Sequence, residues 1–116
     1  MGNLTALEQE LNQLILQGKM MEAFEKFYAE DCHMQENEDA PCVGKDANRK
    51  REEEFLGNVE AFHSGNLVAW AVGDGVSFSE WEFDFTMKGA GRMQQTQIAR
   101  RRWRDGKVVH ERFFHK

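Results

Sequence analysis

The chain has 116 residues, a formal net charge of −5 and an isoelectric point near 5.4. This length suits one domain, which we take to span residues 1–116. The acidic balance argues against nucleic acid as a partner, because phosphate binding needs clustered cations. No run of about 18 apolar residues occurs, so no membrane partner is expected, and the first residues do not resemble a signal peptide. We therefore expect a cytoplasmic protein.

The spacing of cysteines and histidines does not indicate a metal site or a cofactor. Cys32 and Cys42 lack the CxxC spacing of zinc and redox sites, and free thiols are the default in a chain without a secretion signal. The four histidines form neither an HExxH nor an HxH pattern. We expect no metal and no cofactor.

The first half of the chain has the periodicity of helices. A first helix is predicted over Thr5 to Gln17, opened by a capping box in which Thr5 and Glu8 satisfy each other's backbone donors. Its apolar residues recur every three or four positions and form one stripe. Gly18 suits the left-handed C-cap that commonly ends a helix.

The next segments alternate between helix, strand and loop. A second helix is predicted over Met20 to Tyr28, followed by a short strand from Cys32 to Glu36. Residues 37–43, which include the only proline, are predicted to form a loop. A third helix is predicted over Asp46 to Phe62, and the charged residues 49–54 form its solvated face.

The second half has the pattern of four long strands joined by three tight turns. Asp74-Gly75, Lys88 to Gly91 and Asp105-Gly106 separate segments rich in β-branched and aromatic residues. In the strand from Trp81 to Met87, every second residue is large and apolar. Together these side chains form a surface broad enough to be the wall of a pocket. Helices followed by an antiparallel meander predict an α+β domain, with the helices on one face of a sheet.

The first turn predicts which residues share a face of the sheet. A two-residue turn at Asp74-Gly75 places Trp81 opposite Val68 and Ser79 opposite Trp70. Because side chains alternate along a strand, the large apolar residues then lie together. The residues predicted for this face are Val68, Trp70, Val72, Trp81, Phe83, Phe85 and Met87.

The last turn predicts a pair of opposite charges. A two-residue turn at Asp105-Gly106 places Glu111 opposite Arg100 and Phe113 opposite Ile98. A four-residue middle turn brings all four residues onto the aromatic face, whereas a single bulge sends them to the other face. The sequence leaves both possibilities open.

These elements, in this order, resemble the nuclear transport factor 2-like superfamily, in particular its SnoaL-like polyketide cyclases and ketosteroid isomerases. The resemblance rests on Phe27 to Glu36, on Val43-Gly44-Lys45-Asp46 at the start of the third helix, and on the hairpin from Trp103 to Glu111. It implies a cone, in which a highly curved and mainly antiparallel sheet wraps around three N-terminal helices and leaves a pocket at the open end. It also implies a homodimer formed through the outer face of the sheet.

The resemblance further implies a general base and pocket-facing positions. Glu36 falls on the position of the catalytic acid of ketosteroid isomerases, and Glu111, Phe113 and His115 fall on pocket-facing positions of their last strand. Two departures matter, since the first helix has no tyrosine and the third strand of the meander has no aspartic acid. Steroid isomerisation is therefore not expected.

The predicted mechanism uses Glu36 to remove a proton next to a carbonyl. Arg100, held by Glu111, is predicted to stabilise the developing oxyanion. The substrate is predicted to be a small hydrophobic molecule. The predicted substrate-binding residues are Trp70, Trp81, Phe83, Phe85, Phe113 and His115.

Two classes of function follow from these patterns. The first is a small enzyme with isomerase, cyclase or dehydratase-like chemistry that needs no cofactor. The second is a non-catalytic domain that holds an apolar ligand or a peptide in the same cone, because one scaffold hosts many functions. Apolar residues in excess of one core, such as Val76, Phe78, Val109 and Phe114, add to the expectation of a homodimer.

Overall fold

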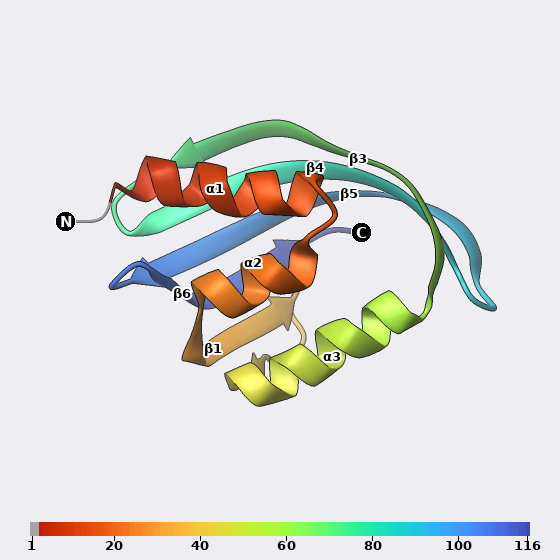
Figure 1. Cartoon of the computed structure of the whole chain (residues 1–116), viewed down its shortest axis with the longest axis horizontal. Coiled ribbons are helices and arrows are strands. Elements are labelled where there is room, and N and C mark those ends of the chain that lie inside the picture. The colour runs from red at the N-terminus through yellow and green to blue at the C-terminus, as the bar shows by residue number, and fades with distance from the viewer. Residues whose placement is uncertain (1–2) are drawn as a thin grey trace.

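Three helices and six strands follow one another in a computed structural model that describes residues 3–116 (Figure 1). The strands form one sheet in the order β2-β1-β6-β5-β4-β3. The helices are α1 (Leu4–Leu16), α2 (Met20–Phe27) and α3 (Lys45–Gly57), and the strands are β1 (Tyr28–Glu36), β2 (Cys42–Val43), β3 (Val59–Val72), β4 (Val76–Met87), β5 (Gly91–Arg104) and β6 (Lys107–Phe114).

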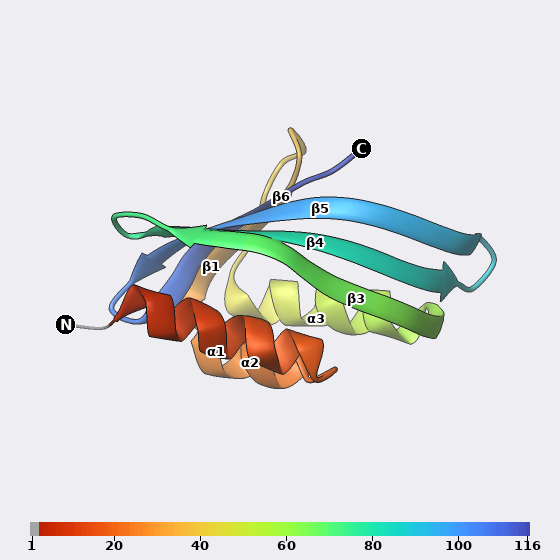
Figure 2. The ribbon, with the colours of Figure 1, turned by 90° about the horizontal axis from the view of Figure 1, so that it is seen from above.

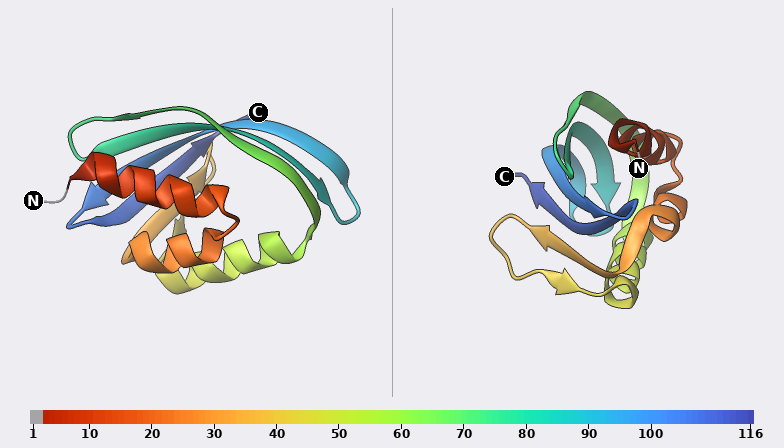
Figure 3. Two further views of the ribbon diagram at one scale, coloured as in Figure 1. Left: turned by 45° about the horizontal axis from the view of Figure 1, so that its top comes forward. Right: turned by 90° about the vertical axis from the view of Figure 1, so that its left-hand side faces the viewer.

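The sheet is curved, and all three helices lie on its inner face (Figures 2 and 3). Its strands pair antiparallel except for β1 and β6, which are parallel, so the sheet is mixed but mainly antiparallel. The turns β3–β4 and β5–β6 lie at the end where α1 begins, and the turn β4–β5 lies at the opposite end (Figure 1). This arrangement confirms the predicted α+β fold with a curved sheet around three helices.

Helix α1 begins one residue earlier than predicted, because a different residue caps it. Asn3 is the N-cap, and its Oδ1 accepts a hydrogen bond from the backbone N–H of Ala6 at 3.3 Å. The capping box of Thr5 and Glu8 is therefore wrong, and Glu8 is instead completely buried. The predicted C-terminal end is confirmed, since Gly18 has a φ of +77° and its N–H donates to the carbonyl of Ile15.

Helix α3 ends five residues before the predicted boundary at Phe62. Asn58 ends the helix, because its backbone N–H and its side-chain Nδ2 both donate to the carbonyl of Glu54, at 3.2 and 3.0 Å. The chain then enters β3 at Val59. Strand β1 is longer than predicted, starting at Tyr28, and the predicted loop 37–43 ends in the short strand β2.

The main hydrophobic core lies where α1 and α2 cover β1 and β6. Phe24 and Tyr28 stack with their ring centroids 5.0 Å apart, and burial of such a side chain contributes about 1.5–3 kcal/mol. The buried residues of this core are Leu11, Ala23, Phe24, Phe27, Tyr28, Cys32, Met34 and Val108.

The outer face of the sheet carries no helix among residues 3–116 (Figure 2). Phe78 and Ile98 lie on it with about two fifths of their surface exposed. Within the described range, none of the helices has the length and apolar character needed to cross a bilayer.

Candidate active site

The register of the meander decides which predicted site residues meet. Met87 pairs with Gly91, so the middle turn is three residues long rather than four. This shift of one residue puts Ile98 and Arg100 on the outer face, because strand side chains alternate. Of the two possibilities that the sequence left open, the four-residue turn that would bring them onto the aromatic face is not the one found.

A bulge in β6 then restores the predicted facing of the last strand. Arg102 pairs with His110 and Trp103 pairs with Val108, so Val109 is an extra residue on β6. After this bulge, Arg101 lies opposite Glu111 and Ala99 lies opposite Phe113. Glu111 therefore faces inward as predicted, but its partner is Arg101.

Arg100 lies among other cations on the outer face. It pairs with Arg112 across the β5–β6 ladder, and the guanidinium groups of both lie over the ring of Phe114, at 5.6 and 4.8 Å. Burial, together with Arg102 and Arg112, lowers the pKa of Arg100. The predicted pairing of Arg100 with Glu111 is wrong, and Arg100 is on the face opposite to the helices.

Arg101 occupies the centre of a buried polar network on the inner face. Its Nε donates to Glu111 at 2.6 Å, and its Nη1 donates to Glu8 at 3.0 Å and to Asn12 at 2.8 Å. Burial alone would lower the pKa of Arg101, but the charges of Glu111, Tyr28 and Glu8 raise it above its ordinary value. The guanidinium thus stays charged and links α1 to β5 and β6.

Hydroxyl groups complete this network. Tyr28 donates to Glu111 at 2.5 Å, and both Ser77 and Ser79 donate to Glu8. Burial and the charge of Glu111 raise the pKa of Tyr28 well above its ordinary value. We call this set the buried polar network: Glu8, Asn12, Tyr28, Ser77, Ser79, Arg101, Trp103 and Glu111.

The buried polar network is closed to solvent. Glu8, Arg101 and Glu111 are each at most 2% exposed. Both carboxylate oxygens of Glu111 already accept hydrogen bonds, from Tyr28 and Arg101. This arrangement suits a scaffold that holds α1 against the sheet.

Glu36 ends β1, as predicted, and its carboxylate contacts the ring of His115 and the guanidinium of Arg51. One oxygen lies 2.7 Å from Nε2 of His115 and the other lies 3.3 Å from Nη2 of Arg51. Burial lowers the pKa of His115, but hydrogen bonds to the Lys116 carbonyl and to Glu36 outweigh it and raise that pKa. The structure therefore brings the predicted residues Glu36 and His115 into direct contact.

A row of aromatic side chains lines the inner face towards the β4–β5 turn. Trp81 stacks on Phe83 with centroids 5.4 Å apart, and Phe85 meets Phe55 of α3 at 5.9 Å. Phe62 of β3 lies 6.2 Å from Phe83. We call Phe55, Phe62, Trp81, Phe83 and Phe85 the aromatic row; Phe55 is 41% and Phe62 60% exposed, so solvent reaches it.

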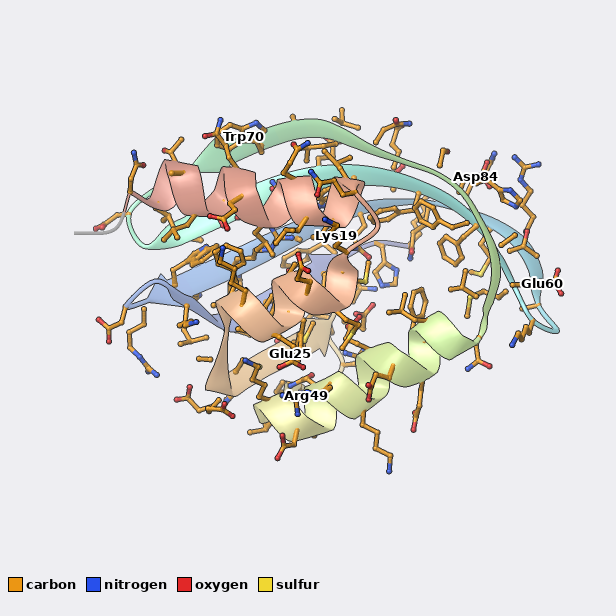
Figure 4. All side chains as sticks on the ribbon, in the orientation of Figure 1. Lys19, Glu25, Arg49, Glu60, Trp70 and Asp84 are labelled. Atoms are coloured by element: carbon orange, nitrogen blue, oxygen red, sulfur yellow. The ribbon has the colours of Figure 1, made fainter. Side chains whose placement is uncertain are left out.

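A bulge in β3 changes the neighbours of this row. Leu67, rather than the predicted Val68, lies opposite Trp81, and Val68 is an extra residue. Trp70 pairs with Ser79 as predicted. Trp70 nevertheless lies beside α1, at the end of the sheet away from Asp84 (Figure 4), and is not part of the aromatic row.

Glu52 of α3 is a candidate that the sequence did not reveal. It lies three residues before Phe55 and four after the buried Asn48, so these side chains share one face of the helix. Burial, together with the carboxylates of Glu111 and Glu36, raises the pKa of Glu52 to about 7. Within residues 3–116, no cation lies within ion-pair distance of its carboxylate. The sequence placed it on a solvated face because its neighbours are all charged.

Asn48 fixes the start of α3 to the first strands. Its Nδ2 donates to the carbonyl oxygens of Cys42 at 2.9 Å and Gly44 at 2.8 Å. Its Oδ1 is buried and accepts no hydrogen bond from residues 3–116. The face of α3 towards the sheet thus carries an unused acceptor one helical turn from Glu52.

Comparisons with known proteins agree with this architecture. The model of the SnoaL-like domain family matches residues 5–115. A protein from Mesorhizobium loti, described as a putative SnoaL-like polyketide cyclase, superposes with a TM-score of 0.89 at 25% identity, covering 97% of this chain and 98% of its own. No curated protein sequence matches the chain.

More distant structures share the fold at lower identity. An epoxide hydrolase of Mycobacterium tuberculosis, described as LEH-like, gives a TM-score of 0.74 at 16% identity, over 97% of this chain and 80% of that one. A ketosteroid isomerase-like protein from Catenulispora acidiphila, solved with trimethylamine, gives 0.67 at 13%, over 78% and 71%. With the family model covering almost its whole length, the chain belongs to the SnoaL-like domain family.

Proposed function

We propose that the protein binds a small hydrophobic organic molecule at the exposed part of the aromatic row beside α3, and that Glu52 transfers a proton at a carbon next to a carbonyl. The proposal rests on the raised pKa of Glu52. A general base works best when its pKa lies near the working pH, and Glu52 has a pKa of about 7 beside exposed aromatic rings. The reaction would be an isomerisation, cyclisation or dehydration.

Glu52 replaces Glu36 as the proposed base because their surroundings differ. Glu36 is bound by His115 and Arg51, and both contacts would have to loosen before it could take a proton. Glu52 has no such partner within residues 3–116. In this proposal Glu36 is a positioning residue, whose negative charge helps to keep the pKa of Glu52 high.

Two groups near Glu52 would help to hold the substrate. Phe55 and Phe85 pack edge to face with their ring centroids 5.9 Å apart, and the exposed part of Phe55 would offer apolar surface to a ligand. The Oδ1 of Asn48 is fully buried without a hydrogen-bond partner within residues 3–116, and a substrate hydroxyl would reach it only if the start of α3 moved. Arg100 has no part in this mechanism, because it lies on the outer face.

Exchange of hydrogen for deuterium tests the proposal without knowledge of the natural substrate. A panel of hydrophobic ketones would be incubated with the protein in D₂O, and NMR would follow loss of the signal next to the carbonyl. Glu52→Gln should slow exchange by about a hundredfold or more, and the rate in the native protein should rise with pH around 7. Glu53→Gln, on the exposed side of α3, is the matched control and should leave the rate unchanged.

Two results would contradict this assignment. Exchange that survives Glu52→Gln but fails in Glu36→Gln would return the role of base to Glu36. Binding of a hydrophobic ligand to the aromatic row, with no exchange in any ketone tested, would favour the alternative of a non-catalytic binding domain. The trimethylamine bound to the Catenulispora acidiphila relative supports small-molecule binding but does not choose between the two.

A homodimer through the outer face is a second part of the proposal. Phe78 and Ile98 give this face an exposed apolar centre. Glu80 lies directly opposite Ile98 and Arg100 lies directly opposite Phe78, so charges of both signs border this apolar centre. Sedimentation should show a dimer at tens of micromolar in the native protein and a monomer in Ile98→Glu.

A further inference from the structure

Strand β5 extends well beyond the strand beside it. Its pairing with β6 ends at Ile98 and Phe114, while its pairing with β4 continues to Gly91. Residues 91–97 therefore have a strand on one side only within the described range. Figure 1 shows this part of the β4–β5 hairpin reaching past the end of β6.

One backbone hydrogen bond fixes which backbone groups point to the free side. The N–H of Trp103 donates to the carbonyl of Gly75 at 2.9 Å, which is towards β4. Successive residues of a strand point their backbone groups to opposite sides, and the β4–β5 ladder has no bulge. The N–H and C=O groups of Arg92, Gln94 and Thr96 therefore point away from β4, to the free edge.

The surface is hollowed along this edge. One hollow is lined by Gln94, Gln95, Thr96 and Lys116, so it lies between β5 and the end of the chain that follows β6. The β5–β6 ladder ends with Phe114 opposite Ile98. If β6 continued beyond Phe114, its next residues would lie opposite residues 96–97 of β5. The hollow thus begins where a neighbouring strand would continue.

The edge also lacks the features that usually protect an unpaired strand. Natural edge strands are blunted by proline, by bulges or by inward-pointing charges. Residues 91–97 contain no proline, and their ladder with β4 is regular. The one charged residue, Arg92, is held on the outer face by Asp84 through bonds of 2.9 and 2.6 Å.

We propose that this edge of β5 binds an extended peptide of another protein, which adds to the sheet as a further strand. Backbone hydrogen bonds to Arg92, Gln94 and Thr96 would supply the affinity, and alternate side chains the specificity. Side chains on the inner side would lie next to Met93 and Gln95, near the aromatic row, and should be apolar. Those on the outer side would lie next to Gln94 and Thr96, and should be polar.

The charges at this edge favour a peptide over a second copy of the chain. Two copies paired antiparallel about Gln94 would place Arg92 of one copy opposite Thr96 of the other, beside Lys116. Symmetry would repeat this contact between like charges. A peptide with an acidic residue at that position would avoid the conflict and gain an opposite charge.

A designed peptide tests the proposal directly. The acetylated and amidated hexapeptide Val-Thr-Val-Thr-Val-Glu would be titrated into the ¹⁵N-labelled full chain. The backbone N–H groups of Arg92, Gln94 and Thr96 should shift and exchange more slowly with solvent. Those of Met93 and Gln95, already directed to β4, should keep their exchange rates.

Two matched pairs separate backbone pairing from side-chain contacts. Gln94→Pro removes an edge N–H without touching the ladder with β4, and should weaken binding about tenfold or more. Gln94→Thr keeps that N–H and should bind like the native chain. The same peptide with alternate backbone nitrogens methylated should not bind, and this comparison decides the question if Gln94→Pro does not fold.

Three outcomes would overturn the proposal. The first is no change in any edge amide at millimolar peptide. The second is equal binding of the methylated peptide, which would show side-chain contacts without strand addition. The third is a self-association in sedimentation that Gln94→Pro abolishes, which would assign the edge to a second copy. The proposal does not depend on the role of Glu52.

Discussion

Two neighbouring parts of the inner face hold carboxylates in opposite conditions. In the buried polar network, Glu8 and Glu111 are bound by Arg101 and by hydroxyl groups, and solvent does not reach them. Beside the aromatic row, Glu52 is only half-buried, yet no cation within residues 3–116 pairs with it. Carboxylate charge is thus compensated in the buried polar network and left without an ion pair, within residues 3–116, at Glu52.

This difference distinguishes carboxylates that stabilise the fold from a carboxylate that could take part in catalysis. A buried carboxylate with full hydrogen bonding is costly to disturb, because removal of one partner leaves a buried charge unpaired. A carboxylate held near apolar side chains without a partner has a pKa near neutrality and readily takes either state. We therefore expect substitutions at Arg101 and at Glu52 to change stability in opposite directions.

The largest effect is expected for Arg101→Met. It would leave Glu8 and Glu111 buried without their shared cation, and breaking a buried ion pair from one side costs about 3–5 kcal/mol. Urea unfolding followed by circular dichroism should show this loss in the free energy of unfolding, or a chain that does not fold at 25 °C.

Arg100→Met is the matched control from the adjacent position. Arg100 lies on the outer face, and its buried Nε has no hydrogen-bond partner within residues 3–116, so its loss should cost less than about 1 kcal/mol. Equal destabilisation by both substitutions would contradict the register described for β5 and β6.

A smaller effect of opposite sign is expected for Glu52→Gln. The pKa of Glu52 is about 7 in the folded chain against an ordinary value of 4.5 in the unfolded chain, so the folded chain holds its proton to higher pH. Stability should therefore fall as pH rises from about 4.5 to 7, by about 2–3 kcal/mol. Glu52→Gln should remove this loss and be the more stable protein at pH 8.

The same substitution should change little at low pH. At pH 4 Glu52 is protonated in the folded chain and mostly protonated in the unfolded chain, so the two proteins should unfold at nearly the same urea concentration. Glu53→Gln should lack the pH-dependent gain, because Glu53 is exposed. A gain of equal size at pH 4 and pH 8 would contradict the proposed origin of the effect.

Much of the architecture could be predicted from local patterns in the sequence. The stripe of α1, the left-handed Gly18 and the three glycine turns each depend on neighbouring residues, and the order of elements follows from them. The end of α3 was misplaced because Glu60 and Phe62 continue an acceptable helical pattern, whereas the side chain of Asn58 caps the helix. Such a cap is visible only once the backbone has turned.

The candidate site was less predictable because it depends on single-residue shifts. The three-residue turn before Gly91 and the bulge at Val109 each move the register by one position. Together they leave Glu111 facing inward but exchange Arg100 for Arg101. No local pattern in the sequence distinguishes Glu52 from its charged neighbours. Its pKa depends in part on Glu111, which is distant in the sequence.

A loss of stability of intermediate size is expected when the N-cap of α1 is removed. Asn3→Ala removes the acceptor of the Ala6 N–H and should cost about 1 kcal/mol of unfolding free energy. Thr5→Ala should cost much less, because Thr5 is exposed and makes no capping hydrogen bond. The opposite ranking in urea unfolding would restore the capping box predicted from the sequence.

The smallest effect is expected at the pair of Glu36 and His115. Contact with Glu36 raises the pKa of His115 above 6.5, whereas burial, Arg100 and other cations lower the pKa of His110. NMR titration of the ring protons should therefore show His115 titrating at higher pH than His110. The stabilisation from this pair should be complete below pH 6.5 and be lost as pH rises through the folded pKa of His115, by less than about 1 kcal/mol. Glu36→Gln should lower the pKa of His115 and leave that of His110 unchanged, and a reversed order of the two histidines would show that this contact does not form in solution.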